Sequence, residues 1–309
     1  MPRPNFFIIG APKCGTTSLN AYLETHPNIY MSPEKEPHFF AEHREMRHAQ
    51  TEEAYLRLFA GAGPQHAVVG EGSTTTLHSP GALERLRAFA PDARIVVMLR
   101  DPVDLVYSMY RHHVYRVQED QPTFADAWRV SVGRAEGRNW PKTARKADPV
   151  QLEYRSFGML GRHIERLLHL FDRDQVHVIL FDDFRKDPGA EYRKVLSFLG
   201  VPDDGRTDFE IKNAAKEHGN NPVGKMVLGL PNPVRKVFRA LGLKHRVKIM
   251  DKVMSTAKPA DRTPLPPDIE AEVRAYFRDD VILLEQLIDR DLSHWYQIKT
   301  AAAVPTSVS

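Results

Sequence analysis

The sequence predicts an α/β protein, a single domain with a mostly parallel central sheet flanked by helices on both faces. Apolar runs such as Phe6–Ile9 and Ile95–Leu99 are typical of strands buried on both faces. Segments with apolar residues at helical spacing lie between these runs, and this alternation favours parallel strands joined by crossover helices. The 309 residues are 42% hydrophobic and 27% charged, as in an ordinary soluble protein. We expect the domain to cover residues 1–296.

Strands and helices are expected to alternate along the chain. The expected strands cover residues 6–9, 28–32, 66–71, 94–99 and 176–181. The expected helices cover residues 17–24, 51–60, 80–90, 103–113, 154–171, 192–199 and 267–289. Asp182 and Asp183, which follow the last strand, are interpreted as the entry to a helix. Gly200 is expected to end the helix that precedes it.

The stretch after the first strand predicts an anion-binding loop. It runs from Gly10 to Ser18 and joins a buried strand to a helix. N–H groups at the start of a helix are unpaired, and the helix dipole favours negative charge there. Lys13 adds a cation, and Thr16, Thr17 and Ser18 add hydroxyl donors. We interpret this loop as a phosphate or sulfate cradle; the alternative is a tight turn that needs glycine for backbone reasons only.

The position of the lysine distinguishes this loop from that of ATPases and kinases. Gly10 and Gly15 have the separation of the Walker A glycines, but that pattern places a lysine directly after the second glycine. Thr16 occupies that position here, and Lys13 precedes Gly15 by two residues. The spacing therefore argues against an ATPase or a kinase.

The variant Pro-Lys-x-Gly-Thr-Thr-Ser resembles the 5′-phosphosulfate loop of the sulfotransferases that use 3′-phosphoadenosine 5′-phosphosulfate (PAPS). The resemblance is to the heparan-sulfate and glucosaminyl sulfotransferases and to bacterial sulfotransferases, and it implies a P-loop-like fold. It also implies that Lys13 lies near the oxygen bridging phosphate and sulfuryl group and stabilises the charge that develops there. The cofactor contacts implied in this loop are Lys13, Cys14, Gly15, Thr16, Thr17 and Ser18.

A second motif resembles the 3′-phosphate site of the same family. Arg100-Asp101-Pro102 follows a buried strand, and Ser108 lies eight residues after Arg100. An arginine at a strand end can bind phosphate through two N–H groups, and a serine two helical turns later can add another donor. The alternative is an Arg100–Asp101 ion pair at a helix start. The two motifs occur in the family's order, which makes a chance match improbable.

The stretch Glu36-Pro37-His38-Phe39-Phe40 closely resembles a segment of the heparan-sulfate sulfotransferases, especially the glucosaminyl 3-O type. In those enzymes the glutamate is the general base, so the resemblance implies that role for Glu36. Lys35 and His38 become candidates for contact with the acceptor. The alternative is an exposed acidic loop that two aromatic side chains anchor.

Further acceptor contacts are expected near the strand that ends at Glu71. The candidates are Glu71, Ser73 and His78, together with His112 on a later helix, and His78 or His112 could replace Glu36 as the base. Where the glucosaminyl 3-O type has a lysine after the glutamate, this chain has Gly72, which argues against a heparan-like acceptor. Adjacent helical side chains such as His112 and His113 diverge by about 100°, so they predict no metal site.

Three further regions are assigned by composition and position. Residues 111–150 are expected to form a wall that selects the acceptor. Residues 212–262 hold twelve Lys/Arg and three Asp/Glu, a net charge of +9 that leaves −6 for the remainder of this +3 chain. We interpret this basic segment, with Lys216, as a cover for the cofactor, and a solvated helical face is the alternative. Residues 297–309 are expected to be a disordered tail.

The predicted function is transfer of a sulfuryl group from PAPS to an acceptor hydroxyl, or less readily an amine, without a metal. The alternatives are a P-loop kinase that uses ATP and a non-catalytic nucleotide-binding protein of the same fold. The expected acceptor is a small molecule or a carbohydrate; no nucleic acid and no integral membrane contact are expected. The sequence names neither the acceptor nor the oligomeric state.

Cysteine content and hydropathy predict a cytoplasmic protein. Cys14 is the one cysteine of the chain, which excludes an internal disulfide and suits a reducing compartment. The apolar run at 6–9 is too short for the core of a signal peptide, and no segment has the length of a membrane span.

Overall fold

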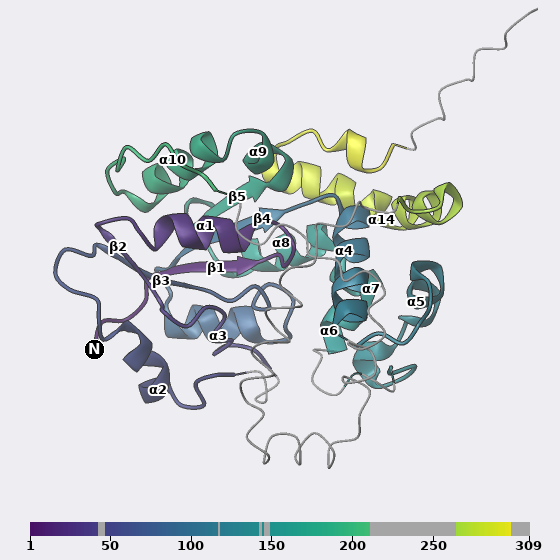
Figure 1. The fold of residues 1–309 in the computed structure, drawn as a ribbon, viewed down its shortest axis with the longest axis horizontal. Coiled ribbons are helices and arrows are strands. Elements are labelled where there is room, and N and C mark those ends of the chain that lie inside the picture. Colours follow the sequence, from purple (N-terminus) through teal and green to yellow (C-terminus); the bar gives the residue numbers. More distant parts are fainter. Residues whose placement is uncertain (43–46, 117, 142–143, 145–148, 211–263, 298–309) are drawn as a thin grey trace, which may run out of the picture.

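The computed structural model describes residues 1–42, 47–116, 118–141, 144, 149–210 and 264–297, and it contains a five-stranded parallel sheet (Figure 1). The strands are β1 (Phe6–Gly10), β2 (Ile29–Met31), β3 (Val68–Gly72), β4 (Arg94–Leu99) and β5 (Val176–Leu180). Their order in the sheet is β2-β3-β1-β4-β5, and all neighbouring pairs are parallel. The predicted α/β fold is confirmed.

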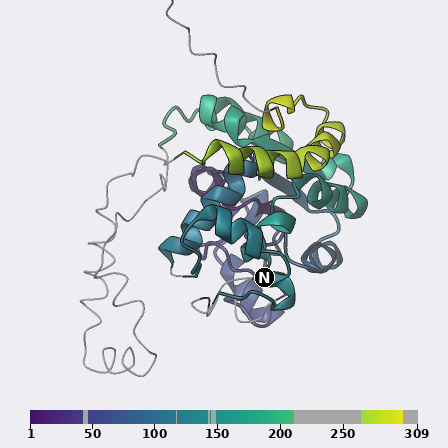
Figure 2. The ribbon, with the colours of Figure 1, turned by 90° about the vertical axis from the view of Figure 1, so that its right-hand side faces the viewer.

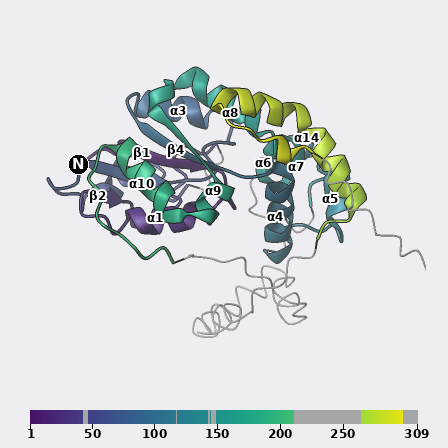
Figure 3. The same cartoon turned by 90° about the horizontal axis from the view of Figure 1, so that it is seen from above.

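Helices cover both faces of this sheet. The helices of the described residues are α1 (Thr16–Leu23), α2 (Glu52–Leu56), α3 (Ala82–Phe89), α4 (Pro102–Tyr115), α5 (Phe124–Val130), α6 (Pro149–Leu152), α7 (Tyr154–Phe157), α8 (Leu160–Leu170), α9 (Phe181–Lys186), α10 (Pro188–Leu199) and α14 (Pro267–Ile288). Seen from above, α1, α9 and α10 lie on one side of the sheet, and α3 and α8 lie on the other (Figure 3). None of the described helices is both long enough and apolar enough to cross a membrane.

The central strands are buried because helices exclude water from both faces. Every residue of β1 and β3 is buried, and β4 is exposed only at its first residue, Arg94. This burial accounts for the continuous apolar runs, since neither side of these strands needs polar residues. The buried side chains of the sheet and the flanking helices, α14 included, form one continuous core.

The expected helix over 154–171 is wrong in one respect, because the structure divides it into α7 and α8. The break falls at Gly158 and Met159, between the two helices. A Cβ added to Gly158 would lie 2.3 Å from the ring of Phe277 in α14. The glycine therefore lets α14 pack directly against the backbone, and its weak helix propensity favours the break at the same point. Figure 2 shows α14 running beside the helices of residues 102–170.

Smaller differences concern the ends of elements. The strand expected at 176–181 ends at Leu180, and Phe181 already belongs to α9. Asp182 and Asp183 lie in the first turn of α9, which confirms their interpretation as a helix entry. The helix expected over 51–60 consists of α2 and a 3₁₀ turn, Arg57–Phe59.

A buried ion pair lies within the 111–150 segment, and contacts with Tyr154 and α14 attach this segment to the rest of the domain. The two Nη atoms of Arg134 donate to the carboxylate of Glu119 at 2.6 and 3.0 Å, and both side chains are 0% exposed. The hydroxyl of Tyr154 donates to the same carboxylate at 2.8 Å. Trp128 adds a second attachment, since its indole N–H donates to Glu272 of α14 at 2.9 Å. These contacts fix the position of the segment that is predicted to select the acceptor.

Replacing Arg134 by methionine should therefore lower the free energy of unfolding by about 3–5 kcal/mol, because the substitution leaves a buried carboxylate without its cation. Urea denaturation measures this change. The control is Arg57→Met, which breaks an exposed ion pair with Glu53 and should cost less than about 0.5 kcal/mol. Equal losses in the two variants would contradict the assigned role of the buried pair.

Candidate functional site

The carboxyl ends of the parallel strands bring the predicted motifs to one edge of the sheet. The loop after β1, the 33–40 segment after β2, the 73–79 segment after β3 and Arg100 after β4 all begin there. Backbone hydrogen bonds join these segments: Leu77 N–H donates to Ile9 O at 2.9 Å, and Glu36 N–H donates to Gly72 O at 3.1 Å. Motifs from distant parts of the sequence thus form one surface.

The loop after β1 has the geometry of an anion cradle. Gly15 immediately precedes α1 with φ 91°, a left-handed conformation that favours glycine. A Cβ at Gly15 would lie 3.3 Å from the rings of Phe181 and Phe184, so the position is also confined. None of the described side chains caps α1 by a hydrogen bond. The N–H groups of Thr16 and Thr17 in its first turn therefore point to the site without an intrahelical partner.

Lys13 is a cation without a counterion in this loop. It is half-buried, has φ 67° and has no ion-pair partner among the residues that the structure describes. Burial lowers the pKa of Lys13, and the guanidiniums of Arg100 and Arg111 lower it further, while Cys14 and Glu36 act in the opposite direction. A bound anion would offset the repulsion among these cations. The local charge therefore favours an anionic ligand.

Arg100 provides a second cationic group at the end of β4. One of its Nη atoms donates to Asp104 at 2.8 Å, and its guanidinium lies 4.9 Å from the centre of the Phe181 ring. The side chain is only 13% exposed. Its buried Nε has no hydrogen-bond partner within the described part of the chain. An arginine that two neighbours orient, with a donor left over, is suited to bind phosphate.

One face of α4 extends this site. Asp104, Ser108 and His112 are four residues apart and therefore lie on the same side of the helix. Burial lowers the pKa of His112 to about 3, and the charge of Lys13 contributes to this shift. His112 is thus neutral near Lys13. Arg111 also acts on Lys13, and sequence analysis missed it, although its place three residues after Ser108 was a usable signal.

Glu36 lies on a loop that its neighbours hold in place. Lys35 Nζ donates to Glu36 Oε1 at 2.9 Å, and Thr74 Oγ1 donates to the same oxygen at 3.3 Å. His38 Nε2 is 3.4 Å from Glu36 Oε2. The Glu36 side chain is 33% exposed, and its charge raises the pKa of Lys13. A partly exposed carboxylate that its neighbours hold in place is in a position to contact a ligand at this surface. Sequence analysis did not identify Thr74 as a partner of Glu36, because nothing in the sequence distinguishes it from the neighbouring Thr75 and Thr76.

Three of the secondary candidates lie beneath this surface. Glu71 and Ser73 are each 1% exposed, and Ser73 Oγ donates to Glu71 Oε2 at 2.7 Å. His78 is buried as well; its ring lies 4.2 Å from that of Phe157 and 4.6 Å from that of His163. Burial also lowers the pKa of His78 well below its usual value. The expectation that these three side chains contact an acceptor conflicts with their burial, and packing against α7 and α8 explains the position of His78.

Some predictions fall on residues that the structure does not describe. Lys216 and the whole of the basic segment 212–262 lie outside the described residues, as does the tail from residue 298. Within the described ranges, no group of three or more His, Cys, Asp or Glu side chains is arranged to hold a metal ion.

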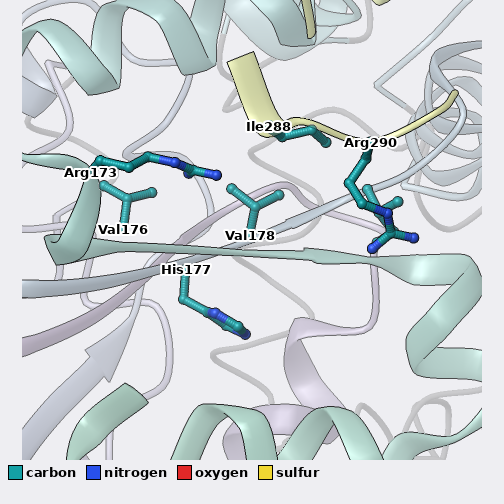
Figure 4. A pocket seen from close by; sticks show the side chains of 7 residues that line it. Arg173, Val176, His177, Val178, Ile288 and Arg290 are labelled. Atoms are coloured by element: carbon teal, nitrogen blue, oxygen red, sulfur yellow. The ribbon is translucent and has the colours of Figure 1, made fainter. Parts of the chain in front are cut away.

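A cavity of about 180 Å³ lies elsewhere, along β5 at the edge of the sheet (Figure 4). Its lining residues are Arg173, Val176, His177, Val178, Leu180, Ile288 and Arg290. Figure 4 shows His177 on the opposite side of the strand from Val176 and Val178. None of the predicted site residues lines this cavity, so it is separate from the site at the strand ends.

Cys14 should resist thiol reagents as long as the protein is folded. The side chain is completely buried, and burial raises the pKa of its thiol to about 12, so the reactive thiolate is scarce at neutral pH. Reaction with a chromogenic disulfide at pH 7 should therefore proceed only at the rate of unfolding and become fast in denaturant. Rapid labelling of the folded protein would contradict this burial.

Comparison with known proteins agrees with these motifs. Residues 3–222 match the family described as "Sulfotransferase domain". The chain is 28% identical over 250 residues to carbohydrate sulfotransferase 15 of Homo sapiens. The matched region covers 64% of this chain and 44% of that protein. It is 30% identical over 203 residues to the bifunctional heparan sulfate N-deacetylase/N-sulfotransferase 3 of Homo sapiens, covering 64% and 22%. The chain thus matches less than half the length of these relatives.

A solved structure extends the likeness to nearly the whole chain. The crystal structure of a sulfotransferase from Alicyclobacillus acidocaldarius matches with a TM-score of 0.71 and 32% identity, over 96% of this chain and 100% of that one. The family match covers most of the sequence, including the loop after β1, Glu36 and Arg100. Sequence motifs, fold and relatives agree, and the chain therefore belongs to the sulfotransferase family of transferases.

Proposed function

We propose that this protein transfers a sulfuryl group from PAPS to a hydroxyl of an acceptor. The observation that carries the proposal is a pair of cationic groups on one surface, Lys13 at the start of α1 and Arg100 at the end of β4. Among the described residues, no side chain caps α1 and none accepts a hydrogen bond from Arg100 Nε. PAPS carries two separate anionic groups, a 5′-phosphosulfate and a 3′-phosphate. Two cationic sites rather than one are what such a cofactor requires.

The residues present fit this cofactor. Lys13 and the N–H groups of Thr16 and Thr17 would hold the 5′-phosphosulfate, and Arg100 with Ser108 would hold the 3′-phosphate. When bound, PAPS supplies an activated sulfuryl group. The ammonium of Lys13 would stabilise the negative charge that develops on the leaving group, and the surrounding cations are oriented before reaction. Asp104 and Phe181 keep the Arg100 guanidinium in its orientation.

Glu36 is the proposed general base. Its carboxylate would accept the proton of the acceptor hydroxyl, a contribution of about 10²–10⁴ in rate. Lys35 and Thr74 both hold Oε1, so Oε2 is the oxygen left to take the proton, with His38 Nε2 beside it. His112 is neutral near Lys13 and is the second candidate for contact with the acceptor.

The proposed acceptor is a small molecule or a carbohydrate. The names of the relatives refer to carbohydrate and to heparan sulfate, which supports a sugar hydroxyl. Gly72 stands in place of the lysine expected for a heparan-like substrate. We therefore favour an acceptor with less negative charge than heparan sulfate. The cytoplasmic location that the cysteine content favours remains a prediction.

Removing the ammonium of Lys13 should affect turnover much more than folding. Lys13→Ala should lower kcat by about 10²–10³, the loss typical of removing one preorganised charge-stabilising group. Its Tm should stay the same or rise, because burial and two guanidiniums disfavour the charged lysine in the folded state. Sulfate release from PAPS and a melting curve measure the two effects. Lys186→Ala, on the exposed end of α9, is the control. An unchanged rate for Lys13→Ala would refute this role.

Ligand-induced stabilisation identifies the cofactor without knowledge of the acceptor. Adenosine 3′,5′-bisphosphate at 100 times its dissociation constant should stabilise the protein by about 2.7 kcal/mol, which raises Tm by several degrees. Arg100→Ala should abolish this shift, and Arg185→Ala, an exposed arginine in α9, should retain it. A shift produced only by ATP with Mg²⁺ would instead indicate a kinase.

A further inference from the structure

Glu71 is a buried acid directly beneath the proposed active site. It lies near the end of β3, is 1% exposed and forms no ion pair with any described residue. Burial raises the pKa of its carboxyl to about 8, and the nearby charge of Glu36 also raises it, whereas Ser73, Lys35 and Tyr55 act in the opposite direction. The carboxyl is therefore mostly protonated at neutral pH, and the proposed mechanism does not use it.

A chain of polar contacts leads from Glu71 to Glu36. Ser73 Oγ donates to Glu71 Oε2 at 2.7 Å, so the hydroxyl hydrogen points toward Glu71. The lone pairs of Ser73 Oγ are then free to accept, and the backbone N–H of His38 donates to this oxygen at 3.0 Å. The ring of the same histidine lies beside Glu36, with Nε2 at 3.4 Å from Oε2. Three consecutive contacts thus connect the buried acid with the proposed base.

The loop that carries the base needs such an anchor. Glu36 and His38 have φ values of 60° and 52°, in the left-handed region that costs about 1–2 kcal/mol for a residue with a side chain. Such a conformation persists only where neighbouring groups hold it. Three anchors come from residues 72–75: Gly72 O accepts from Glu36 N–H, Ser73 Oγ accepts from His38 N–H, and Thr75 Oγ1 lies 2.9 Å from His38 Nδ1.

We propose that Glu71 is a positioning residue which, through Ser73 and His38, holds the carboxylate of Glu36 where it can take the acceptor proton. The proposal rests on the role assigned to Glu36 above. Glu71 acts in its neutral form. The titratable groups that face it are Glu36 and Lys35 from the segment after β2 and Tyr55 from α2. Ionisation of Glu71 would place a second carboxylate beside Glu36 with only Lys35 to balance it, and the loop would shift.

The first test is a pH–rate profile of sulfate release from PAPS to water, which needs no known acceptor. The wild-type rate should fall above about pH 8. Glu71→Gln keeps a neutral group of the same shape, so its rate at pH 7 should stay within about twofold of the wild-type rate. At alkaline pH the variant should lack the part of the decline in rate that ionisation of Glu71 causes. An alkaline limb unchanged in Glu71→Gln would overturn the proposal.

The second test separates positioning from a purely structural role. Glu71→Ala and Ser73→Ala should each lower kcat by about 10- to 100-fold and leave KM for PAPS within about twofold, because misplacing the base affects the reacting geometry and not the cofactor site. Glu24→Gln, an exposed acid that follows α1, is the control. Ser73→Ala leaves the buried acid in place, so it remains informative if Glu71→Ala does not fold. An unchanged kcat in Ser73→Ala would overturn the proposal.

A third readout does not depend on activity. The pKa of Glu71 is higher in the folded state, so unfolding releases its proton between about pH 4.5 and pH 8, and the stability of the wild type falls as pH rises through this range. Glu71→Gln lacks this loss, so its Tm relative to wild type should increase from pH 5 to pH 9. A constant difference would refute the buried neutral acid and with it the positioning role. If the difference appears but the wild type never consumes PAPS, the proposed function fails instead.

Discussion

Lys13, Arg100 and Arg111 gather at one edge of the sheet, and no described carboxylate pairs with Lys13. Burial and mutual repulsion make this arrangement costly for the free protein, because the pKa of Lys13 is lowered where no anion balances it. The parallel sheet makes the gathering possible, since it directs the carboxyl end of every strand to the same edge. The charge of Lys13, which no described carboxylate pairs with, therefore favours an anionic ligand at this edge of the sheet.

The neighbours of these cations hold them before any ligand arrives. Asp104 and Phe181 orient Arg100, and the rings of Phe181 and Phe184 confine Gly15 at the start of α1. The short helix α9, which follows β5, therefore contacts both Arg100 and the loop that carries Lys13. Such preorganisation matters for transfer reactions, in which positioning and charge stabilisation supply most of the rate.

The proposed base is organised in a different way. The position of Lys13 is set by the start of α1 and by Gly15. The position of Glu36 is set by a strained loop, which hydroxyl and backbone groups of residues 72–75 hold by hydrogen bonds. The buried Glu71 behind this loop connects the chemistry at the surface with the packing of β3. The proposed cofactor half and the proposed acceptor half of the site are thus supported by separate contacts, and a substitution in one half need not disturb the other.

The sequence by itself determined the fold class, the family and the order of the motifs, because the apolar runs of β1 and β4, the Lys13 loop and the Arg100 motif are local patterns. Only the tertiary structure decided which candidates share a surface. Glu71, Ser73 and His78 looked like acceptor contacts from their place after β3, yet long-range packing buries them. The break at Gly158 depends on Phe277, more than a hundred residues away, and the pairing of Thr74 with Glu36 depends on two neighbouring strand ends. Contacts between residues so far apart in the chain leave no periodic or local signal, so only the folded arrangement reveals them.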